Sequence, residues 1–442
     1  MTIVPPDVPD RQVGFPTALS LVVGGMIGSG VFLLPASLAP YRGTSLIGWV
    51  VSAGGAVLLA LVFARLARAH PATGGPYAYT RRAFGDLAGF LVGWGYWISC
   101  WTTNGALAVA FVGYLDPFFP GAVRHPPSAA LMAVAAVWLL TWVNSRGVRS
   151  AGRMQVATTV LKVLPLLLIG FAGLTQFAPA HFVVTETSVT ALGGNVVAVV
   201  TLTLWAFLGL ECATIPAGSV RDASRVIPRA TIAGTLAAGA IYIVSTVGVM
   251  SVVPPETLAT TTAPFAEAAR ALFGDGMARL VALGAAISCF GALNAWVLLA
   301  GQLPMAMARD RLFPEVFARL SSRGTPTRGM VIGGLLTTAL IAANYTQGLV
   351  ALFTFIILLA TLSVLIPYAF CSLAVFVEGP SGGIAAVPRG AAVIAGLAFT
   401  YALIAIGGAG PDTVYWGFLL LLAGLPVYIW VLGRRSKAGA VS

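Results

Sequence analysis

The sequence predicts an all-α, polytopic membrane protein of about twelve transmembrane helices, folded as a single domain over residues 1–442. Composition is the first observation behind this prediction, since 58% of the 442 residues are hydrophobic, 9% are charged, and the mean hydropathy is +0.92. A water-soluble domain carries about 25% charged residues, so this chain lacks the polar side chains needed to cover a surface in water. The second observation is a repeated apolar run of about 20 residues, the length that a helix needs to cross a bilayer.

The apolar runs set the predicted spans, with boundaries uncertain by a few residues. They cover roughly 15–38, 46–66, 86–114, 128–144, 155–175, 191–216, 228–253, 277–305, 329–345, 349–376, 388–408 and 413–433. The connections between them are short, and no separate soluble domain is expected.

The distribution of lysine and arginine predicts the orientation. If the N-terminus lies inside, the inner connections carry 20 of these residues and the outer connections carry 4, with Lys162 inside a span. Cytoplasmic loops are the ones enriched in Lys and Arg. We therefore expect a multi-pass protein of the bacterial inner membrane with both termini in the cytoplasm, and we read the net charge of +11 as this signal and not as a nucleic-acid surface.

Side chains for catalysis or metal binding are scarce in the spans. The four cysteines all fall inside apolar runs without a CxxC pair, and the three histidines fall in connections. Isolated cysteines in such runs are typical of buried, inert thiols. No cofactor, metal or enzymatic activity is expected, and a channel is disfavoured because few polar residues lie at membrane depth.

Glycines interrupt two of the predicted spans. The first contains Gly24, Gly25, Gly28 and Gly30 within seven residues, and the sixth contains Gly209. Broken spans at matching places in two halves point to an inverted-repeat transporter with its site at the breaks. The alternative is that these glycines only allow close helix packing.

The two breaks predict a site for a zwitterion. A half-helix beginning after 28–30 offers free N–H groups and a positive dipole end, which suit a carboxylate. A half-helix ending near 207–209 offers carbonyl groups and a negative dipole end, which suit an ammonium group. An α-amino acid carries both groups on one carbon atom.

Lys162 and Glu211 are the charged side chains deepest in the predicted spans. A charge at that depth costs several kcal/mol and usually has a function. Lys162 could gain and lose a proton as the protein opens to each side, or act as a fixed countercharge. Glu211 could be a protonatable group near the ammonium site, or a neutral acid bonded to the backbone.

Two tryptophans and one amide lie at membrane depth. Trp205 and Trp296 could attract a cation over their ring faces, although such residues more often only pack. Asn104 could hydrogen-bond a substrate or pair between helices.

Several segments together resemble the amino acid–polyamine–organocation superfamily, and within it the basic amino acid/polyamine antiporters, most of all the bacterial arginine/agmatine antiporters. These segments are GSGVFLLPASLA (28–39), GGPYAYTRRAFG (74–85), GYWISCWTTN (95–104), TLWAFLGLE (203–211), GALNAWVLLAGQ (291–302) and IPYAFC (366–371). The resemblance implies a LeuT-type fold, with inverted repeats over about 15–175 and 191–376, two further helices over about 388–433, and a homodimer in many members.

The resemblance also implies residue roles. Ser29 and Gly30 would bind the substrate carboxylate, and the backbone at Trp205 and Leu208 would hold the α-amino group. Trp296 would stack on the substrate side chain. The side-chain pocket would be lined by Ser99, Cys100, Asn104 and Ala360.

Gating and proton coupling are implied in the same way. Trp205 and Phe353 would pack over the bound substrate, and Tyr96 and Tyr368 would close gates. Glu211 would sense protons. Lys162 resembles the lysine that proton-coupled members carry in place of a sodium ion.

Four positions depart from the arginine/agmatine antiporters, and one of them is Lys162, where those proteins look apolar. Gly25 stands where those proteins have asparagine, Leu107 where they have methionine, and Ala360 where they have serine. These three changes remove or soften polar contacts around the site.

The chain nevertheless retains Trp296, Asn104 and Cys100, and this set suits a planar cation. We therefore expect a transporter that exchanges a basic amino acid such as arginine for its decarboxylated amine such as agmatine. The alternative is a proton-coupled carrier or exchanger of neutral amino acids that uses Lys162.

Overall fold

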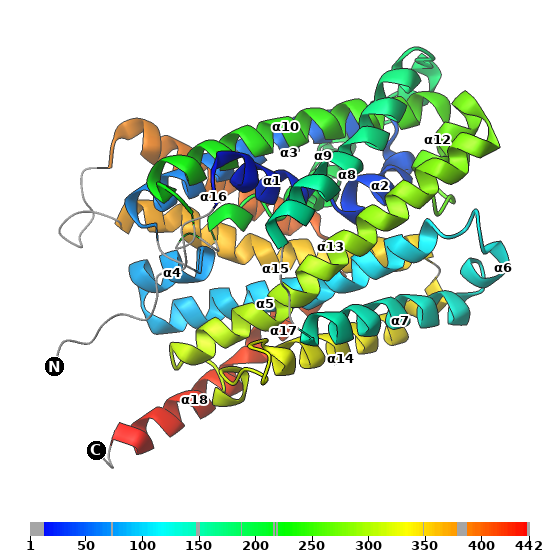
Figure 1. Cartoon of the computed structure of the whole chain (residues 1–442). Coiled ribbons are helices and arrows are strands. Elements are labelled where there is room, and N and C mark those ends of the chain that lie inside the picture. Colours follow the sequence, from blue (N-terminus) through cyan, green and yellow to red (C-terminus); the bar gives the residue numbers. More distant parts are fainter. Residues whose placement is uncertain are drawn as a thin grey trace.

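The computed structural model of the chain is all-α. It describes residues 13–71, 74–146, 151–186, 188–214, 217, 220–347, 349–377 and 387–439. Within these ranges, β pairing is limited to one isolated bridge between Val13 and Val220. The long helices lie side by side in one bundle (Figure 1).

Nine helices or broken helices of the described part are long and apolar enough to cross a membrane. They are Phe15–Tyr41 (α1 Phe15–Met26, α2 Ser29–Leu38 and η1 Ala39–Tyr41), Thr44–Ala69 (α3), Pro126–Ser145 (α7), Val189–Thr214 (α9 Val189–Leu204, η3 Trp205–Phe207 and η4 Cys212–Thr214), Ala223–Val252 (α10), Asp275–Arg309 (α13), Leu349–Val377 (α15), Arg389–Gly408 (α16) and Pro411–Arg434 (α17 Pro411–Leu422 and the first part of α18 Gly424–Gly439).

The remaining three predicted spans are also helical. They are α5 (Asp86–Gly113), α8 (Ala151–Leu174) and α14 (Thr327–Asn344). α5 is 28 residues long and its middle turns carry polar residues such as Ser99, Thr102 and Thr103, which lower its hydropathy. It lies inside the protein, packed chiefly against α13 and α15, so these polar residues are kept away from lipid.

The first predicted span is broken, as the glycine pattern predicts. α1 ends at Met26, and α2 begins at Ser29. Between them Ile27 is extended (φ −75°, ψ 90°) and Gly28 has φ −125° and ψ −135°. A helix cannot continue through these torsions, so backbone polar groups are exposed at this point inside the bundle.

The sixth predicted span is broken as well. The α-helix α9 ends at Leu204 and a short 3₁₀ turn, η3, follows. Leu208 is then extended (φ −63°, ψ 133°), and Gly209 has φ 101°, a left-handed value that favours glycine. The break therefore lies over Leu208–Glu211, slightly after the end of the regular helix.

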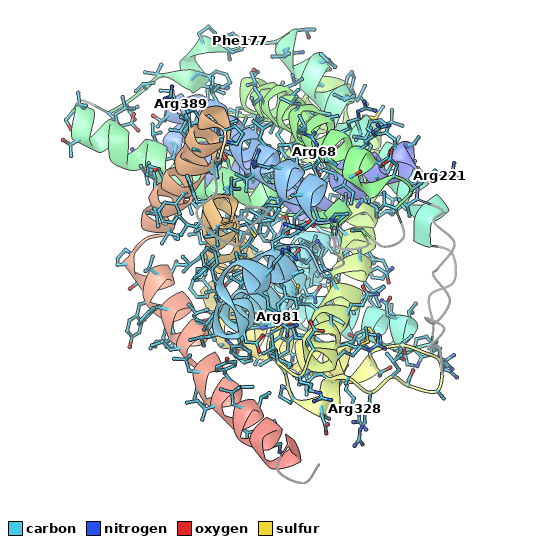
Figure 2. The ribbon with its side chains drawn as sticks, turned by 90° about the vertical axis from the view of Figure 1, so that its left-hand side faces the viewer. Arg68, Arg81, Phe177, Arg221, Arg328 and Arg389 are labelled. Atoms are coloured by element: carbon cyan, nitrogen blue, oxygen red, sulfur yellow. The ribbon has the colours of Figure 1, made fainter. Side chains whose placement is uncertain are left out.

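Arginines gather at one end of the bundle, here called the arginine-rich end, which includes Arg68, Arg81, Arg221, Arg328 and Arg389. α4 (Pro76–Phe84) and the end of α18 lie at this end, whereas α6 (Pro120–Val123) and α12 (Pro264–Phe273) lie at the other (Figure 1). Figure 2 looks onto the arginine-rich end and shows these five residues spread over several helices. Tyr77 and Arg81 of α4 both contact Asp310 just after α13, at 2.9 Å each, and so tie two connections together at this end.

Candidate functional site

The two broken helices meet each other in the middle of the bundle. A methyl group on the Cα atom of Gly209 would lie 2.9 Å from the carbonyl carbon of Gly25 and 3.0 Å from its oxygen. A methyl group on Gly25 would lie 2.8 Å from the sulfur of Cys212. Gly209 needs glycine because it touches the backbone of Gly25 and because its φ is positive, whereas Gly25 leaves room for the Cys212 side chain.

The meeting point carries opposite electrical poles. The first N–H groups of an α-helix have no carbonyl partner within it, and they give that end a positive character. α2 begins here, and Gly28 before it makes no side-chain cap. α9 ends here with its negative pole, and one of the freed carbonyls, that of Ala206, accepts a hydrogen bond of 2.9 Å from Tyr242. The geometry suits a ligand with a carboxylate beside an ammonium group.

A small central pocket of about 20 Å³ lies between these elements. Its lining residues are Gly25, Met26, Gly28, Gly30, Thr103, Leu107, Trp205, Leu208 and Trp296. The Cα atom of Gly30 faces the indole of Trp205 so closely that an added methyl group would lie 2.8 Å from the ring nitrogen. This volume holds about one water molecule, so the pocket is smaller than an amino acid.

A second, larger cavity of about 200 Å³ shares Gly25 and Trp296 with the central pocket. It also includes Lys162, Leu299 and Gln302. Since α13 runs toward the arginine-rich end, Leu299 and Gln302 lie on that side of Trp296. This inner cavity therefore extends from the central pocket toward the arginine-rich end.

Lys162 faces the inner cavity from α8 and is only 3% exposed. Its ammonium nitrogen lies 3.4 Å from the carbonyl oxygen of Gly24, next to the break in the first span. Among the described residues, no carboxylate lies within salt-bridge distance of it. An unpaired ammonium group at this depth is costly, and its charge acts directly on whatever occupies the cavity.

Glu211 is fully buried in the break after α9, and both of its carboxylate oxygens are occupied. Tyr96 of α5 donates a hydrogen bond of 2.7 Å to Oε1. Tyr368 of α15 donates one of 2.5 Å to Oε2. The carboxylate therefore joins the unwound segment to two other helices, a contact between three predicted site residues that the sequence did not predict.

The other predicted site residues lie around this centre but outside the lining of the central pocket. Ser99, Cys100 and Asn104 are buried on α5, and Ala360 and Phe353 are buried on α15. The Ser99 hydroxyl donates to the carbonyl of Tyr96 in its own helix, whereas the Asn104 side-chain oxygen has no partner among the described residues. The Ser29 side chain lies outside the described residues. Substrate binding by any of these side chains stays a prediction.

Sequence reasoning missed several lining residues, of which Thr103 and Gln302 carry uncharged polar side chains with oxygen or nitrogen atoms. Thr103 lines the central pocket and Gln302 lines the inner cavity. Thr103 lies four residues before Leu107, hence on the same helical face, and this spacing is the signal that could have identified it. Gln302 lies six residues after Trp296, which does not place it on the same face by spacing alone.

Aromatic side chains fill the end of the bundle opposite the arginine-rich end. Phe32 of α2 packs edge-on against Phe265 of α12 and against Tyr114, with ring centroids 5.4 and 5.8 Å away. The Tyr114 hydroxyl donates a hydrogen bond of 2.5 Å to the carbonyl of Phe32. These three side chains are fully buried and join α2 to α12 and to the end of α5.

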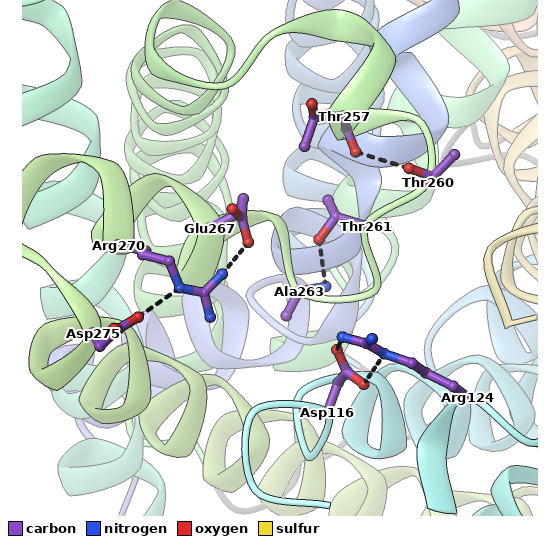
Figure 3. A network of polar contacts seen from close by, with 9 residues as sticks. All are labelled: Asp116, Arg124, Thr257, Thr260, Thr261, Ala263, Glu267, Arg270 and Asp275. Atoms are coloured by element: carbon purple, nitrogen blue, oxygen red, sulfur yellow. Dashed lines mark hydrogen bonds and ion pairs between the residues drawn. The ribbon is translucent and has the colours of Figure 1, made fainter. Parts of the chain in front are cut away.

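A polar cavity of about 530 Å³ lies beyond these aromatic side chains. Figure 3 shows its ion pairs, which join Arg124 to Asp116 and Arg270 to both Glu267 and Asp275. Each pair is formed between residues at most eight positions apart in the chain, so none of them ties distant helices together.

No group of three His, Cys, Asp or Glu side chains is placed to hold a metal ion within the part of the chain that the structure describes. The polar groups at the breaks are instead backbone N–H and C=O groups, hydroxyls, one lysine and one carboxylate. Opposite backbone poles of this kind suit a small solute that carries both a carboxylate and an ammonium group.

Comparison with known proteins shows which protein family the chain matches. Residues 13–432 match the family model described as amino acid permease. The chain is 35% identical to the cadaverine/lysine antiporter of Escherichia coli (strain K12) over 75% of this chain and 74% of that protein. It is 30% identical to the putrescine transporter PotE of the same strain over 97% of this chain and 99% of that protein.

One solved structure shares the fold at low sequence identity. It is the crystal structure of the Eremococcus coleocola manganese transporter in complex with an aromatic bis-isothiourea substituted compound. The TM-score is 0.57 at 13% identity, and the match covers 95% of this chain and 94% of that one. This likeness concerns the arrangement of helices alone.

Proposed function

Because the chain belongs to the amino acid permease family, we propose that it exchanges a basic amino acid for its decarboxylated amine across the bilayer by alternating access. The family is one of transporters, so the protein is a multi-pass membrane transporter and not an enzyme.

One observation carries the proposal, namely the contact between the two broken helices, where Gly25 at the end of α1 meets Gly209 in the second break. The start of α2 provides the positive pole for a carboxylate, and the end of α9 provides the negative pole for an ammonium group. Transporters with discontinuous helices hold their substrates at such paired ends. Ser29 and Gly30 would bind the carboxylate, and the backbone at Trp205 and Leu208 would bind the α-amino group.

The tryptophans that line the central pocket are evidence for a substrate with a cationic side chain. Trp205 and Trp296 both line the central pocket, and an indole face attracts a cation by about 2 kcal/mol when water is excluded. The relatives support the same class, since their names give cadaverine with lysine, and putrescine. Arginine with agmatine and lysine with cadaverine are therefore the pairs to test first.

The predicted topology completes the proposal. All twelve predicted spans would cross the membrane, as two inverted repeats over about 15–175 and 191–376 followed by two helices. The arginine-rich end would face the cytoplasm of a bacterium, in keeping with the enrichment of arginine in cytoplasmic loops. The inner cavity would then be the cytoplasmic approach to the site, with the outer approach closed by Phe32, Tyr114 and Phe265. A homodimer remains part of the proposal.

Lys162 favours a second candidate, a proton-coupled carrier or exchanger of neutral amino acids. Its ammonium group lines the inner cavity with no carboxylate partner among the described residues, so it repels a cationic substrate in its charged form. A neutral amino acid avoids this repulsion, and loss of the lysine proton would then couple transport to the proton gradient.

Exchange in proteoliposomes separates the two candidates. Vesicles are loaded with agmatine or cadaverine, and uptake of radiolabelled arginine or lysine is measured with and without a pH gradient. The proposal expects uptake that depends on the internal amine and continues without a gradient. Uptake that stops without a gradient, or that alanine inhibits and agmatine does not, would favour the neutral carrier and contradict the exchange.

A further inference from the structure

Thr103 has a hydroxyl group that the fold leaves unused inside the central pocket. The residue is 2% exposed, and its Oγ1 atom has no hydrogen-bond partner among the described residues. A buried hydroxyl in a helix normally donates to a carbonyl three or four residues earlier. An unpaired buried polar atom lowers stability, so the arrangement calls for a partner that is absent from the chain itself.

The neighbouring threonine shows that the helix could have satisfied this group. Thr102 is fully buried on the same turn of α5, and its hydroxyl donates to the carbonyls of Ile98 and Ser99 at 2.9 and 3.0 Å. The hydroxyl of Thr103 makes no such bond, and the residue lines the central pocket together with Leu107 and Trp296. The hydroxyl is thus available to a pocket occupant.

The position of Thr103 fixes which part of the substrate it can meet. The backbone ends of α2 and α9 occupy the side of the pocket where the common amino acid groups would bind. Leu107 touches the break in the first span, since a methyl group on Gly28 would lie 3.3 Å from its Cδ2 atom. Thr103 lies one turn nearer the start of α5, on the side toward the arginine-rich end and away from that contact. A substrate side chain extending from the breaks would run past Leu107 to the hydroxyl.

We propose that Thr103 is a specificity-determining residue whose hydroxyl accepts a hydrogen bond from an N–H group at the end of the substrate side chain. This inference rests on the proposed function and narrows it to amino acids and amines that end in a nitrogen donor. A site with a polar group of this kind rejects analogues that lack the matching group, because the buried hydroxyl then stays unpaired. A methyl-terminated analogue of equal length should therefore bind more weakly than lysine or arginine.

The test compares two ligands of equal length on purified protein in proteoliposomes. Lysine ends in an ammonium group, and 2-aminoheptanoate has a methyl group at that position. Each is tested as a competitor of labelled substrate exchange in the wild type, Thr103→Val, Thr103→Ser and Thr102→Val. Valine has the shape of threonine without the hydroxyl, serine keeps the hydroxyl, and Thr102→Val removes a hydroxyl that is already bonded within its helix.

Thr103→Val is expected to weaken inhibition by lysine about tenfold or more, since a hydrogen bond to a charged group is lost. Inhibition by 2-aminoheptanoate should stay the same or become stronger. Thr103→Ser and Thr102→Val should both keep the wild-type ratio of the two ligands. For any variant that reconstitutes poorly, the two ligands are compared instead by how far each raises the melting temperature of the detergent-purified protein.

Two results would overturn the assignment. Equal losses for both ligands in Thr103→Val would place the hydroxyl on the amino acid end or in packing, and wild-type inhibition by both ligands would mean that it contacts neither. Failure of the proposed function gives a different result, because the wild type would then show no exchange of basic amino acids for amines.

Discussion

Tyr368 and Glu211 are 157 residues apart in the chain, yet the tyrosine hydroxyl donates a hydrogen bond of 2.5 Å to the carboxylate. Tyr96 donates a second one to the other oxygen, at 2.7 Å. The unwound segment after α9 is thereby fastened to α5 and α15 at a single side chain. Any movement that separates these helices during transport has to break or rearrange these two bonds.

Replacing Tyr368 by phenylalanine removes one of these bonds and leaves a carboxylate oxygen buried without a partner. We expect the variant to lose about 1–3 kcal/mol of stability, measured by thermal unfolding of the purified protein in detergent. Tyr401→Phe is a matched control. The hydroxyl of Tyr401, on α16, contacts Ser52 of α3 at 3.2 Å and no carboxylate. A loss for Tyr368→Phe no larger than for the control would show that the carboxylate does not depend on the tyrosine.

Replacement of Gly209 is the second change that the fold predicts to lower both stability and exchange. Alanine there is strained by the φ of 101°, and its methyl group would press on the backbone of Gly25 at 2.9 Å. We expect Gly209→Ala to cost about 1–3 kcal/mol and to reduce exchange strongly in proteoliposomes. Gly396→Ala in the interior of α16 is the control, because nothing lies within 4 Å of an added methyl group there, and it should be as stable as the wild type or more so. Wild-type exchange in Gly209→Ala would contradict the close contact of the breaks.

Much of the fold could be predicted from the sequence because lipid and helix geometry impose simple rules. Apolar runs located the long helices of the described part, nine of which are apolar enough to cross a membrane, and glycines marked both breaks. The ends were less accurate, since the span predicted over 46–66 is the helix Thr44–Ala69. Arg65 and Arg68 lie in its last turns, where a charged side chain is compatible with a helix but lies outside an apolar run.

The candidate site was harder to predict because it depends on contacts between distant segments. No periodicity connects Glu211 with Tyr96 or Tyr368, so their contact follows only from the packing of α5 and α15 around the break. Thr102 and Thr103 are the same residue type in adjacent positions, and only the packing distinguishes the bonded hydroxyl from the unbonded one. The small volume of the central pocket is likewise a property of packing.

Trp296 lines both the central pocket and the inner cavity, and its role can be tested by the charge of the ligand. If its indole holds a cation, Trp296→Ala should weaken binding of a cationic substrate by about 2 kcal/mol, or about 30-fold. A neutral substrate of similar size should lose less. The measurement is inhibition of exchange by arginine and by a neutral analogue, and equal losses for the two would indicate that the tryptophan only packs.

The folding stability of the protein should depend on pH through Glu186, which lies at the end of the bundle opposite the arginine-rich end. Its carboxylate accepts hydrogen bonds from Asn195 of α9 at 2.6 Å and from Thr44 of α3 at 2.9 Å. The bond from Asn195 is the main reason why the pKa of Glu186 lies below its usual value. A lowered pKa means that the folded state favours the ionised form, so the stabilisation is present above the ordinary value of about 4.3 and is lost as the pH falls through the lowered one.

The comparison for Glu186 is the melting temperature of the wild type and of Glu186→Ala across this range. At pH 7 the wild type should melt at the higher temperature, and the difference should shrink as the pH falls below about 4. Glu256→Ala is the control, because that carboxylate forms an exposed ion pair with Arg42, which stabilises little. A difference between the wild type and Glu186→Ala that is constant from pH 7 to pH 3.5 would contradict the linkage.

Two replacements of Lys162 show whether this residue gains and loses a proton during transport or acts as a fixed charge. Alanine removes the ammonium group beside Gly24, whereas arginine keeps a positive charge that does not titrate. If the lysine gains and loses a proton during transport, exchange by both variants should depend less on pH than exchange by the wild type, measured from pH 5 to pH 9 in proteoliposomes. If it is only a fixed charge, Lys162→Arg should retain the wild-type profile and Lys162→Ala should lose activity at every pH, because the positive charge beside the Gly24 carbonyl is then missing. A wild-type pH profile in Lys162→Ala would exclude both roles, and transport would then have to be explained by the backbone poles at the two breaks and by Glu211.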